Sequence, residues 1–161
     1  LVEGDGTNGF KSIDKEADVK KIKKITTKAK SAGKTPFADA IEEAVDFVRP
    51  TAGRRYLIVK TEDRKVLLDE LRQATANANV RIKNDDAEIA SEVGVDEIIV
   101  YTGTKAVKPT VLVDQKYHID MQDITKVDAF EWKTNSNMIL VETLTSGHVE
   151  TYNAGAVITV A

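Results

Sequence analysis

The sequence contains no cysteine, and this absence removes several kinds of chemistry at once. The chain cannot form disulfides, cannot use a thiolate as a nucleophile and cannot build a cysteine zinc site. A chain without cysteine also fits a reducing compartment. Histidine is nearly as scarce, because only His118 and His148 occur, far apart in the sequence and without a short metal-ligand spacing.

Long apolar runs are absent as well. No run approaches the roughly 20 residues of a membrane helix, and no apolar core follows the lysine-rich stretch from Lys11 to Lys34, as a signal peptide would require. The 161 residues are 42% hydrophobic and 30% charged, which is ordinary for one globular domain. The net charge of −3 provides no overall field that favours nucleic acid.

A glycine-rich turn opens the chain at Gly4-Asp5-Gly6-Thr7-Asn8-Gly9-Phe10. Gly4, Gly6 and Gly9 fit the spacing of a dinucleotide-binding turn, but that motif follows a strand, opens a helix and precedes an acidic residue by about 20 positions. The segment after the turn is lysine-rich instead, and the turn also lacks the ligands of an EF-hand. We interpret it as a structural turn, with a small nucleotide-binding domain using Gly4 to Gly9 as the alternative.

The first residue is Leu1, not methionine, so we expect Leu1 and Val2 to end an element of a longer parent. In the basic segment that follows, Val19, Ile22 and Ile25 recur every three positions, which predicts a short helix or an irregular arm. Its lysines are interpreted as a solvated face, with contact to a packaged genome or an acidic neighbour as the alternative. The lysines are Lys15, Lys20, Lys21, Lys23, Lys24, Lys28, Lys30 and Lys34.

Two helices, and a third segment that is a short helix or a turn, are predicted between residues 35 and 94. The first is capped by Thr35, begins at Pro36 and ends before Pro50. Its apolar stripe is Phe37, Ile41, Ala44, Val45 and Val48, opposite the acidic residues Asp39, Glu42, Glu43 and Asp46. The second is capped by Thr61, carries Glu62 and Asp63 in its first turn and buries Leu67, Leu68 and Leu71. A third segment, 87–93, is predicted as a short helix or a turn that stops at Gly94.

Short strands are predicted at 56–59, 97–101, 110–113, 117–120, 124–133, 138–145, 149–152 and 156–160. Asn135-Ser136-Asn137 and Ser146-Gly147 are predicted turns between the later strands. Helices interleaved with strands, followed by a mostly antiparallel meander, indicate an α+β fold.

No residue is predicted to be catalytic, cofactor-binding or metal-ligating, and we expect no enzyme. Gly33-Lys34-Thr35 resembles the end of a Walker A loop, but Lys28 occupies the position of the required glycine. The sequence has no Gly-x-Ser-x-Gly elbow and no His-Glu-x-x-His motif. The cluster of Asp85, Asp86 and Glu88 is interpreted as a solvated turn. His118 and His148 are interpreted as hydrogen-bonded structural residues, and Phe130 and Trp132 as packing residues.

The order of these segments resembles the major capsid (coat) protein of tailed phages, whose Hong Kong 97-type fold is shared with encapsulins. Gly4 to Phe10 is similar to the turn after the long spine helix of that family, and Ala38 to Val48 to the helix before its central strand. The other matching segments are Tyr56 to Asp63, Gly94-Val95 with Ile98 to Val100, Asn137 to Glu142, and Ala154 to Val160.

The resemblance implies one truncated fragment over 1–161, with a joint turn at 1–14, an axial-type α/β domain at 15–120 and antiparallel strands of the peripheral domain at 121–161. The N-terminal arm, the extended loop and the spine helix would lie upstream. Asn137 falls near the asparagine through which some members crosslink, but Leu144 stands where the assisting acid is expected, so no crosslink is inferred.

The same resemblance implies a structural subunit that forms pentamers and hexamers around a genome, in a virion assembled in the bacterial host cytoplasm. The implied partners are other copies of the protein, with a scaffolding protein or protease and packaged DNA as further ones, and no membrane. We expect the fragment alone to be a monomer or a weak oligomer. Thr102 to Lys108 and Lys83 to Glu88 are the candidate inter-subunit loops, and an encapsulin-like shell protein is the alternative within this fold.

Overall fold

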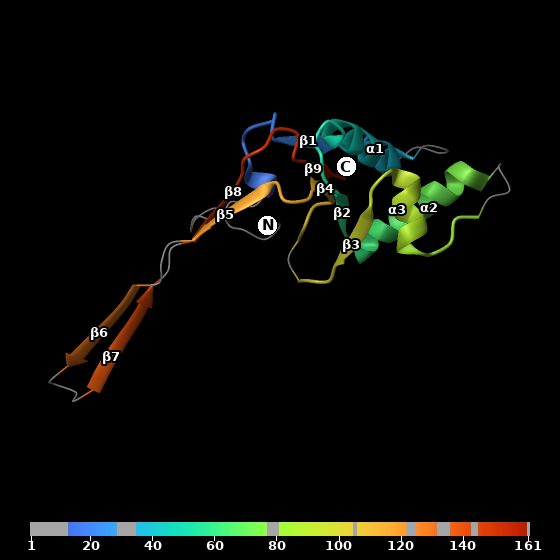
Figure 1. Ribbon diagram of the computed structural model, residues 1–161. Helices are drawn as coiled ribbons and strands as arrows, with labels where there is room; N and C mark the ends of the chain where they lie inside the picture. Colours follow the sequence, from blue (N-terminus) through green and yellow to red (C-terminus); the bar gives the residue numbers. More distant parts are fainter. Residues whose placement is uncertain are drawn as a thin grey trace.

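A mixed five-stranded sheet organises the chain (Figure 1). The computed structural model describes residues 13–28, 35–76, 81–104, 106–121, 125–131, 136–142 and 145–160. The strand order is β1-β9-β4-β2-β3. The bounds are β1 Ile22–Thr26, β2 Arg55–Lys60, β3 Glu97–Tyr101, β4 Thr110–Val113 and β9 Gly155–Thr159.

The two outer pairs of this sheet are parallel, and the centre is antiparallel. β1 pairs parallel with β9, and β2 pairs parallel with β3, while β4 lies antiparallel to both β9 and β2. Helices and strands are mixed as the α+β prediction requires. The strands of 121–161 are not all antiparallel, however, because β9 enters the main sheet beside β1.

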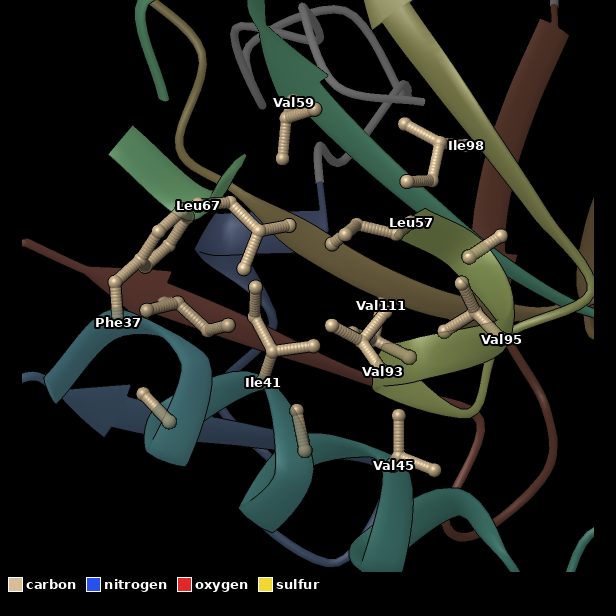
Figure 2. Close-up of a cluster of buried hydrophobic side chains, with 14 of the residues drawn as sticks. Phe37, Ile41, Val45, Leu57, Val59, Leu67, Val93, Val95, Ile98 and Val111 are labelled. Atoms are coloured by element: carbon tan, nitrogen blue, oxygen red, sulfur yellow. The ribbon is translucent and has the colours of Figure 1, made fainter. Parts of the chain in front are cut away.

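Within the described residues, all three α-helices pack on one face of the sheet (Figure 2). They are α1 Pro36–Val48, α2 Thr61–Thr75 and α3 Asp86–Val93. Phe37 and Ile41 from α1 meet Leu57 from β2 and Leu67 from α2, all of them buried. The predicted apolar stripe of α1 and the three predicted core leucines of α2 are therefore confirmed as core residues.

The first turn of α1 is capped by a distant carboxylate. Glu70 of α2 is only 1% exposed, and its Oε2 accepts the backbone N–H groups of Phe37 and Ala38, each at 2.9 Å. Pro36 has no N–H to satisfy at the first position. Thr35 is the N-cap residue and Pro36 begins the helix, as predicted, but the Thr35 side chain makes no capping hydrogen bond and its hydroxyl instead donates to Asp39 Oδ1 at 3.2 Å.

The other helix ends also depend on backbone geometry. The expectation that Thr61 caps α2 is wrong, since Thr61 is the first helical residue and Lys60 is the N-cap. The predicted stop at Gly94 is confirmed: its φ of 76° is left-handed, and the Val95 N–H reaches back to Ala90 O at 3.0 Å, as in a Schellman motif.

The segment predicted as a short helix or an irregular arm is strand β1. Ile22 and Ile25 are both buried, but they lie in different hydrophobic clusters on opposite faces of the sheet. A spacing of three places two residues of a strand on opposite faces, so the helix-like spacing here reflects a strand covered on both sides. Val19 precedes the strand and is 65% exposed.

A second, smaller cluster covers the other face of the sheet at one end. It consists of Ile13, Ile22, Val149, Ala154 and Val157, with Leu112 and Tyr117 packed against it. Ile13 comes from the 3-10 helix η1 Ile13–Lys15. The cluster thus lies over β1, β9 and β4, and Leu112 on β4 is its member nearest to β2.

The remaining described strands form an extended ribbon that leads away from the sheet (Figure 1). β5 Tyr117–Met121 pairs antiparallel with β8 Thr145–Val149, and β6 Thr125–Glu131 pairs antiparallel with β7 Ser136–Glu142. Ser146 and Gly147 were predicted to form a turn but lie inside β8, and Ser136 and Asn137 lie inside β7. The partner of β8 is β5, a pairing that local turn signals do not reveal.

We expect Glu70→Ala to destabilise the protein strongly, because it leaves the buried N–H groups of Phe37 and Ala38 without an acceptor. The expected loss of unfolding free energy is roughly 2–4 kcal/mol, measured by urea denaturation. Asp69→Ala, an exposed neighbour on the same helix, is the control and should stay within about 0.5 kcal/mol. Equal losses in the two variants would contradict the capping role.

Candidate interaction surfaces

The predicted inter-subunit loop from Thr102 to Lys108 connects the edge strand β3 to β4. Its described residues are mostly exposed. The loop begins next to Tyr101, and a Cβ on Gly103 would fall 1.9 Å from the Tyr101 hydroxyl oxygen. Glycine at 103 therefore allows the loop to fold back over the Tyr101 ring at the end of β3.

The second predicted loop, from Lys83 to Glu88, is exposed but anchored. Arg64 Nε contacts Asp86 Oδ1 at 2.5 Å, and its NH1 group donates to Asn84 Oδ1 at 2.7 Å. Just before the loop, Arg72 donates to the carbonyl of Ile82 at 3.1 Å. The acidic cluster interpreted as a solvated turn thus has one member, Asp86, engaged with α2, and Asp86 is also the first residue of α3.

A partly exposed region lies on the face of β2 and β3 opposite the helices, and we call it the β2–β3 face. It consists of Tyr56, Ile58 and Lys60 on β2 and Glu97, Ile99 and Tyr101 on β3. Ile99 is 43% exposed, whereas its neighbour Ile98 points into the core and is buried. Parallel strands are normally covered on both faces. The second cluster stops at Leu112, and on the β2–β3 face Glu97 and Ile99 are exposed while the other four residues are half-buried.

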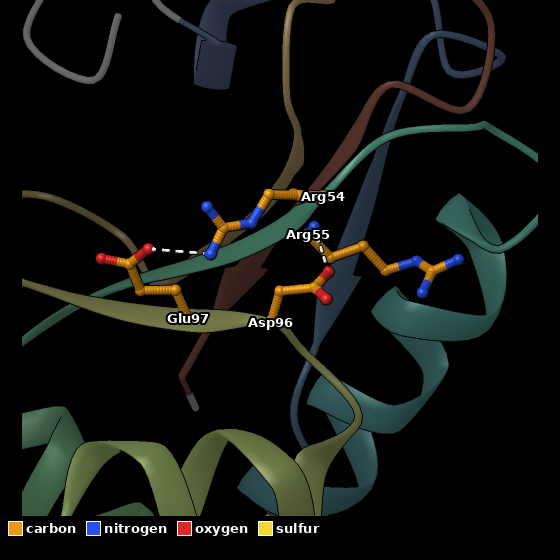
Figure 3. A network of polar contacts seen from close by, with 4 residues as sticks. All are labelled: Arg54, Arg55, Asp96 and Glu97. Carbon is orange, nitrogen blue, oxygen red and sulfur yellow. Dashed lines mark hydrogen bonds and ion pairs between the residues drawn. The ribbon is translucent and has the colours of Figure 1, made fainter.

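Charged groups fix the beginning of these two strands (Figure 3). The Arg55 N–H donates to Asp96 Oδ2 at 2.7 Å, and the Asp96 N–H donates to Arg55 O at 2.9 Å. Arg54 lies 5.4 Å from the ring centre of Tyr56 and 3.4 Å from Glu97 Oε2. Both ends of the Arg54–Glu97 pair are largely exposed, so this ion pair contributes little stability and is available to other partners.

Lys60 marks the opposite end of the β2–β3 face, where β2 passes directly into α2. Its backbone N–H donates to the carboxylate of Asp63, which lowers the pKa of that group. Desolvation by burial, followed by the nearby charge of Glu62, outweighs this effect and raises the pKa of Asp63 above its ordinary value. In the second cluster, burial likewise raises the pKa of Tyr117.

The structure brings together the two histidines that the sequence separates. His118 on β5 is directly opposite His148 on β8, with ring centroids 5.7 Å apart. His148 Nε2 also lies 3.6 Å from Glu150 Oε1. Sequence spacing could not predict this pair, because it depends on which strand pairs with β5.

The lysines of the basic segment fall into two groups. Lys23 forms an ion pair with Glu43 of α1 at 2.7 Å, and Lys21 donates to the carbonyl of Val149 at 2.8 Å. Lys15, Lys20, Lys24 and Lys28 are exposed. The exposed group fits the interpretation as a solvated face, and the paired lysines join β1 to its neighbours.

A groove between the three helices is lined by Ala38, Val45, Leu71, Val93 and further residues of these helices. In the part of the chain that the structure describes, no three histidine, aspartate or glutamate side chains converge as metal ligands. Among the same residues, no helix is long and apolar enough to cross a membrane.

Several residues singled out from the sequence lie outside the described residues. These are the Gly4 to Gly9 turn, Lys30, Gly33 and Lys34, Trp132, Asn135 and Leu144. Conversely, Glu70 and the β2–β3 face were missed. The alternation of Tyr56, Ile58 and Lys60 does not indicate which face of the strand the helices cover. Glu70 caps a helix other than its own, so the sequence around α1 contains no motif that predicts this cap.

The chain is similar over its whole length to phage capsid proteins. A protein named "Capsid protein" from Lactococcus phage p2, and another of the same name from Lactococcus phage SK1, are each 96% identical to it over 161 residues. The chain spans 41% of the length of each relative. No family model matches the sequence. The resemblance to a phage capsid protein is thereby confirmed, and these relatives are structural proteins rather than enzymes.

We expect the raised pKa of Asp63 to make the protein less stable, relative to Asp63→Asn, as the pH rises. The folded state binds this proton more tightly than the unfolded state. The contribution is therefore present below the ordinary value of 3.8 and is lost as the pH rises through the raised folded value. Melting temperatures of the two proteins between about pH 3 and pH 7 measure the trend.

Asp69→Asn is the control, because it removes an exposed negative charge from the same helix. It measures how far the loss of such a charge alone changes the pH dependence of the melting temperature. A constant difference between the natural protein and Asp63→Asn across this pH range would contradict the prediction.

Proposed function

We propose that this chain is part of a structural subunit of an icosahedral phage head, and that it acts without catalysis. The observation that carries the proposal is the 96% identity to two phage capsid proteins across all 161 residues. Identity this high over the whole chain supports the same fold for the corresponding part of both relatives. Assembly with other copies of the same protein follows from this role.

The proposed architecture is the Hong Kong 97-type fold. In this assignment 1–14 is a joint turn, 15–120 belongs to the axial domain, and 121–161 contributes strands of the peripheral domain. The sheet with helices on one face supports an axial-type α/β body, and the ribbon of β5 to β8 supports a separate antiparallel part. The arm, the extended loop and the spine helix would belong to the part of the longer relatives that this chain does not cover.

Subunits of a closed shell meet through different surfaces on neighbouring copies, and such heterologous contacts close into rings. The chain has exposed loops at 83–88 and 102–108, a partly exposed sheet face and a projecting hairpin. These surfaces suit contacts within pentamers and hexamers. The exposed lysines of 15–28 suit the inner wall of a shell that encloses DNA, because lysines neutralise phosphates without reading sequence.

An encapsulin-like shell protein is the alternative within the same fold. Unlike a phage head, such a shell does not enclose a phage genome. A nucleotide-binding domain that uses Gly4 to Gly9 is the alternative from a different class. The identity to capsid proteins favours the phage head over both.

We expect the longer polypeptide that contains this chain to form hexamers, pentamers or closed shells when it is produced in bacteria with its scaffolding partner. Negative-stain electron microscopy and sedimentation measure the assemblies. The 161-residue chain alone is the matched control and should sediment as a monomer or weak oligomer. Absence of shells and capsomers from the longer polypeptide would overturn the proposal.

A thermal-shift assay with nucleotides separates the two classes of function. A binding domain gains stability with free ligand by mass action, by about 2.7 kcal/mol at a hundred times its dissociation constant. We expect no shift with ATP or NAD, and a concentration-dependent shift would favour the nucleotide-binding alternative.

A further inference from the structure

The antiparallel pair of β5 and β8 carries both histidines of the chain at directly opposite positions. His118 is paired with His148, and the centres of the two imidazole rings are 5.7 Å apart. Directly opposite residues of an antiparallel pair have their side chains on the same side, with Cβ atoms about 5 Å apart. The expectation that neither histidine binds a metal rested on their distance in the sequence, and this pairing removes that distance.

The neighbouring residues fix the side of the ribbon to which the histidines point. Tyr117 and Val149 are also directly opposite each other, and both belong to the second cluster, where Val149 is only 3% exposed. Successive side chains of a strand point to opposite sides, so His118 and His148 lie on the side away from this cluster. His118 is exposed, and the side chain of His148 is 43% exposed. Both rings are therefore accessible to a dissolved ion.

The main sheet anchors the strand positions that carry the two histidines. Lys21 donates from Nζ to the carbonyl of Val149 at 2.8 Å, next to His148 in the chain. Tyr117, next to His118, packs against the cluster that covers β1, β9 and β4. Figure 1 shows β5 and β8 between the five-stranded sheet and the β6–β7 hairpin. Because the backbone is already held in place, binding of an ion has to order only the two rings.

The distance between the rings suits one ion that both of them bind. A bond of about 2.0–2.1 Å from an imidazole nitrogen to a metal places the ring centre roughly 3 Å from the ion, so two rings that share an ion have centres about 5–6 Å apart. The observed 5.7 Å, with ring planes tilted by 56°, lies within this range. Glu150 Oε1 lies 3.6 Å from His148 Nε2, so a negative charge adjoins the pair and attracts a cation.

We infer that His118 and His148 together bind one divalent transition-metal ion of the Zn²⁺ class, with water completing its coordination. Imidazole nitrogen suits Zn²⁺, Ni²⁺ and Cu²⁺, whereas Mg²⁺ and Ca²⁺ prefer oxygen ligands. A site with two protein ligands agrees with the finding that no three such side chains converge among the described residues. The ion joins β5 to β8 at the base of the β6–β7 hairpin. This inference rests on the strand pairing and not on the proposed function.

Titration with Zn²⁺ tests the site in the 161-residue chain, produced without a histidine tag. Calorimetry measures the affinity, and NMR follows the ring protons of the two histidines, which are the only ones in the sequence. We expect one ion per chain, a shift of both histidine signals with the same midpoint, and no such shift with Mg²⁺. His118→Gln or His148→Gln should weaken Zn²⁺ binding by roughly tenfold to a hundredfold, because each leaves a single ligand.

A variant with an unchanged number of histidines is the matched control. Combined His118→Gln and Thr104→His moves one histidine to the exposed loop between β3 and β4, where 102–108 contains no acidic residue. We expect this variant to bind Zn²⁺ as weakly as His118→Gln alone, because binding depends on the opposed positions and not on histidine content. The shared midpoint of the two signals in the natural chain needs no variant, so the test does not depend on how the variants fold.

Three results would overturn the site. The first is a shift of only one histidine signal with Zn²⁺, which means that the rings do not share an ion. The second is binding to the Thr104→His control as tight as to the natural chain. The third is tight binding by an equal mixture of the His118→Gln and His148→Gln chains, which indicates an ion held between two copies. Shell assembly by the longer polypeptide is measured separately, so the capsid role stands or fails independently of these results.

Discussion

The relative position of helices α1 and α2 depends on one buried carboxylate. Glu70 of α2 satisfies the first free N–H groups of α1, and its negative charge lies at the positive end of the α1 dipole. A buried carboxylate without these partners would be very unfavourable, so the two helices hold each other in a single relative position. Since α2 continues from β2 without a loop, the same bond also positions the end of β2 and therefore Lys60.

This arrangement gives the sheet two different sides. One side is closed by three helices, with Phe37, Ile41 and Leu67 at its centre. The other is closed only over β1, β9 and β4, where Ile13 and Val149 pack against Val157. The asymmetry follows from the order of the elements. All three described helices lie between β1 and β3 in the sequence, and all three pack their apolar residues on the same face of the sheet.

Sequence patterns identified the elements well where burial is one-sided. The stripe of α1 and the Gly94 stop were predicted because each leaves a local signal, a helical period or a residue able to adopt positive φ. β1 was misinterpreted because both of its faces are buried, which removes the alternation that marks a strand. The turn at Ser146-Gly147 was wrong because the local signal for a turn competes with pairing to β5, which is distant in sequence.

Of the candidate surfaces, only those with a local sequence signal could be predicted. The exposed loops at 83–88 and 102–108 are visible as polar stretches between apolar runs. The β2–β3 face depends on which strand is at the edge, and the His118–His148 pair depends on strand register; neither follows from spacing. The family resemblance, which relied on the order of many weak segments, succeeded where single motifs could not.

The place of β9 in the sheet has a consequence for how the protein folds. This strand comes after all the others in the described chain, yet it lies between β1 and β4, near the middle of the sheet. Its pairing with β1 joins segments from opposite ends of the described chain, and contacts this distant in sequence form slowly. The β6–β7 hairpin, by contrast, pairs neighbouring segments and can close in microseconds. The projecting hairpin is therefore expected to exist before the sheet that carries it is complete.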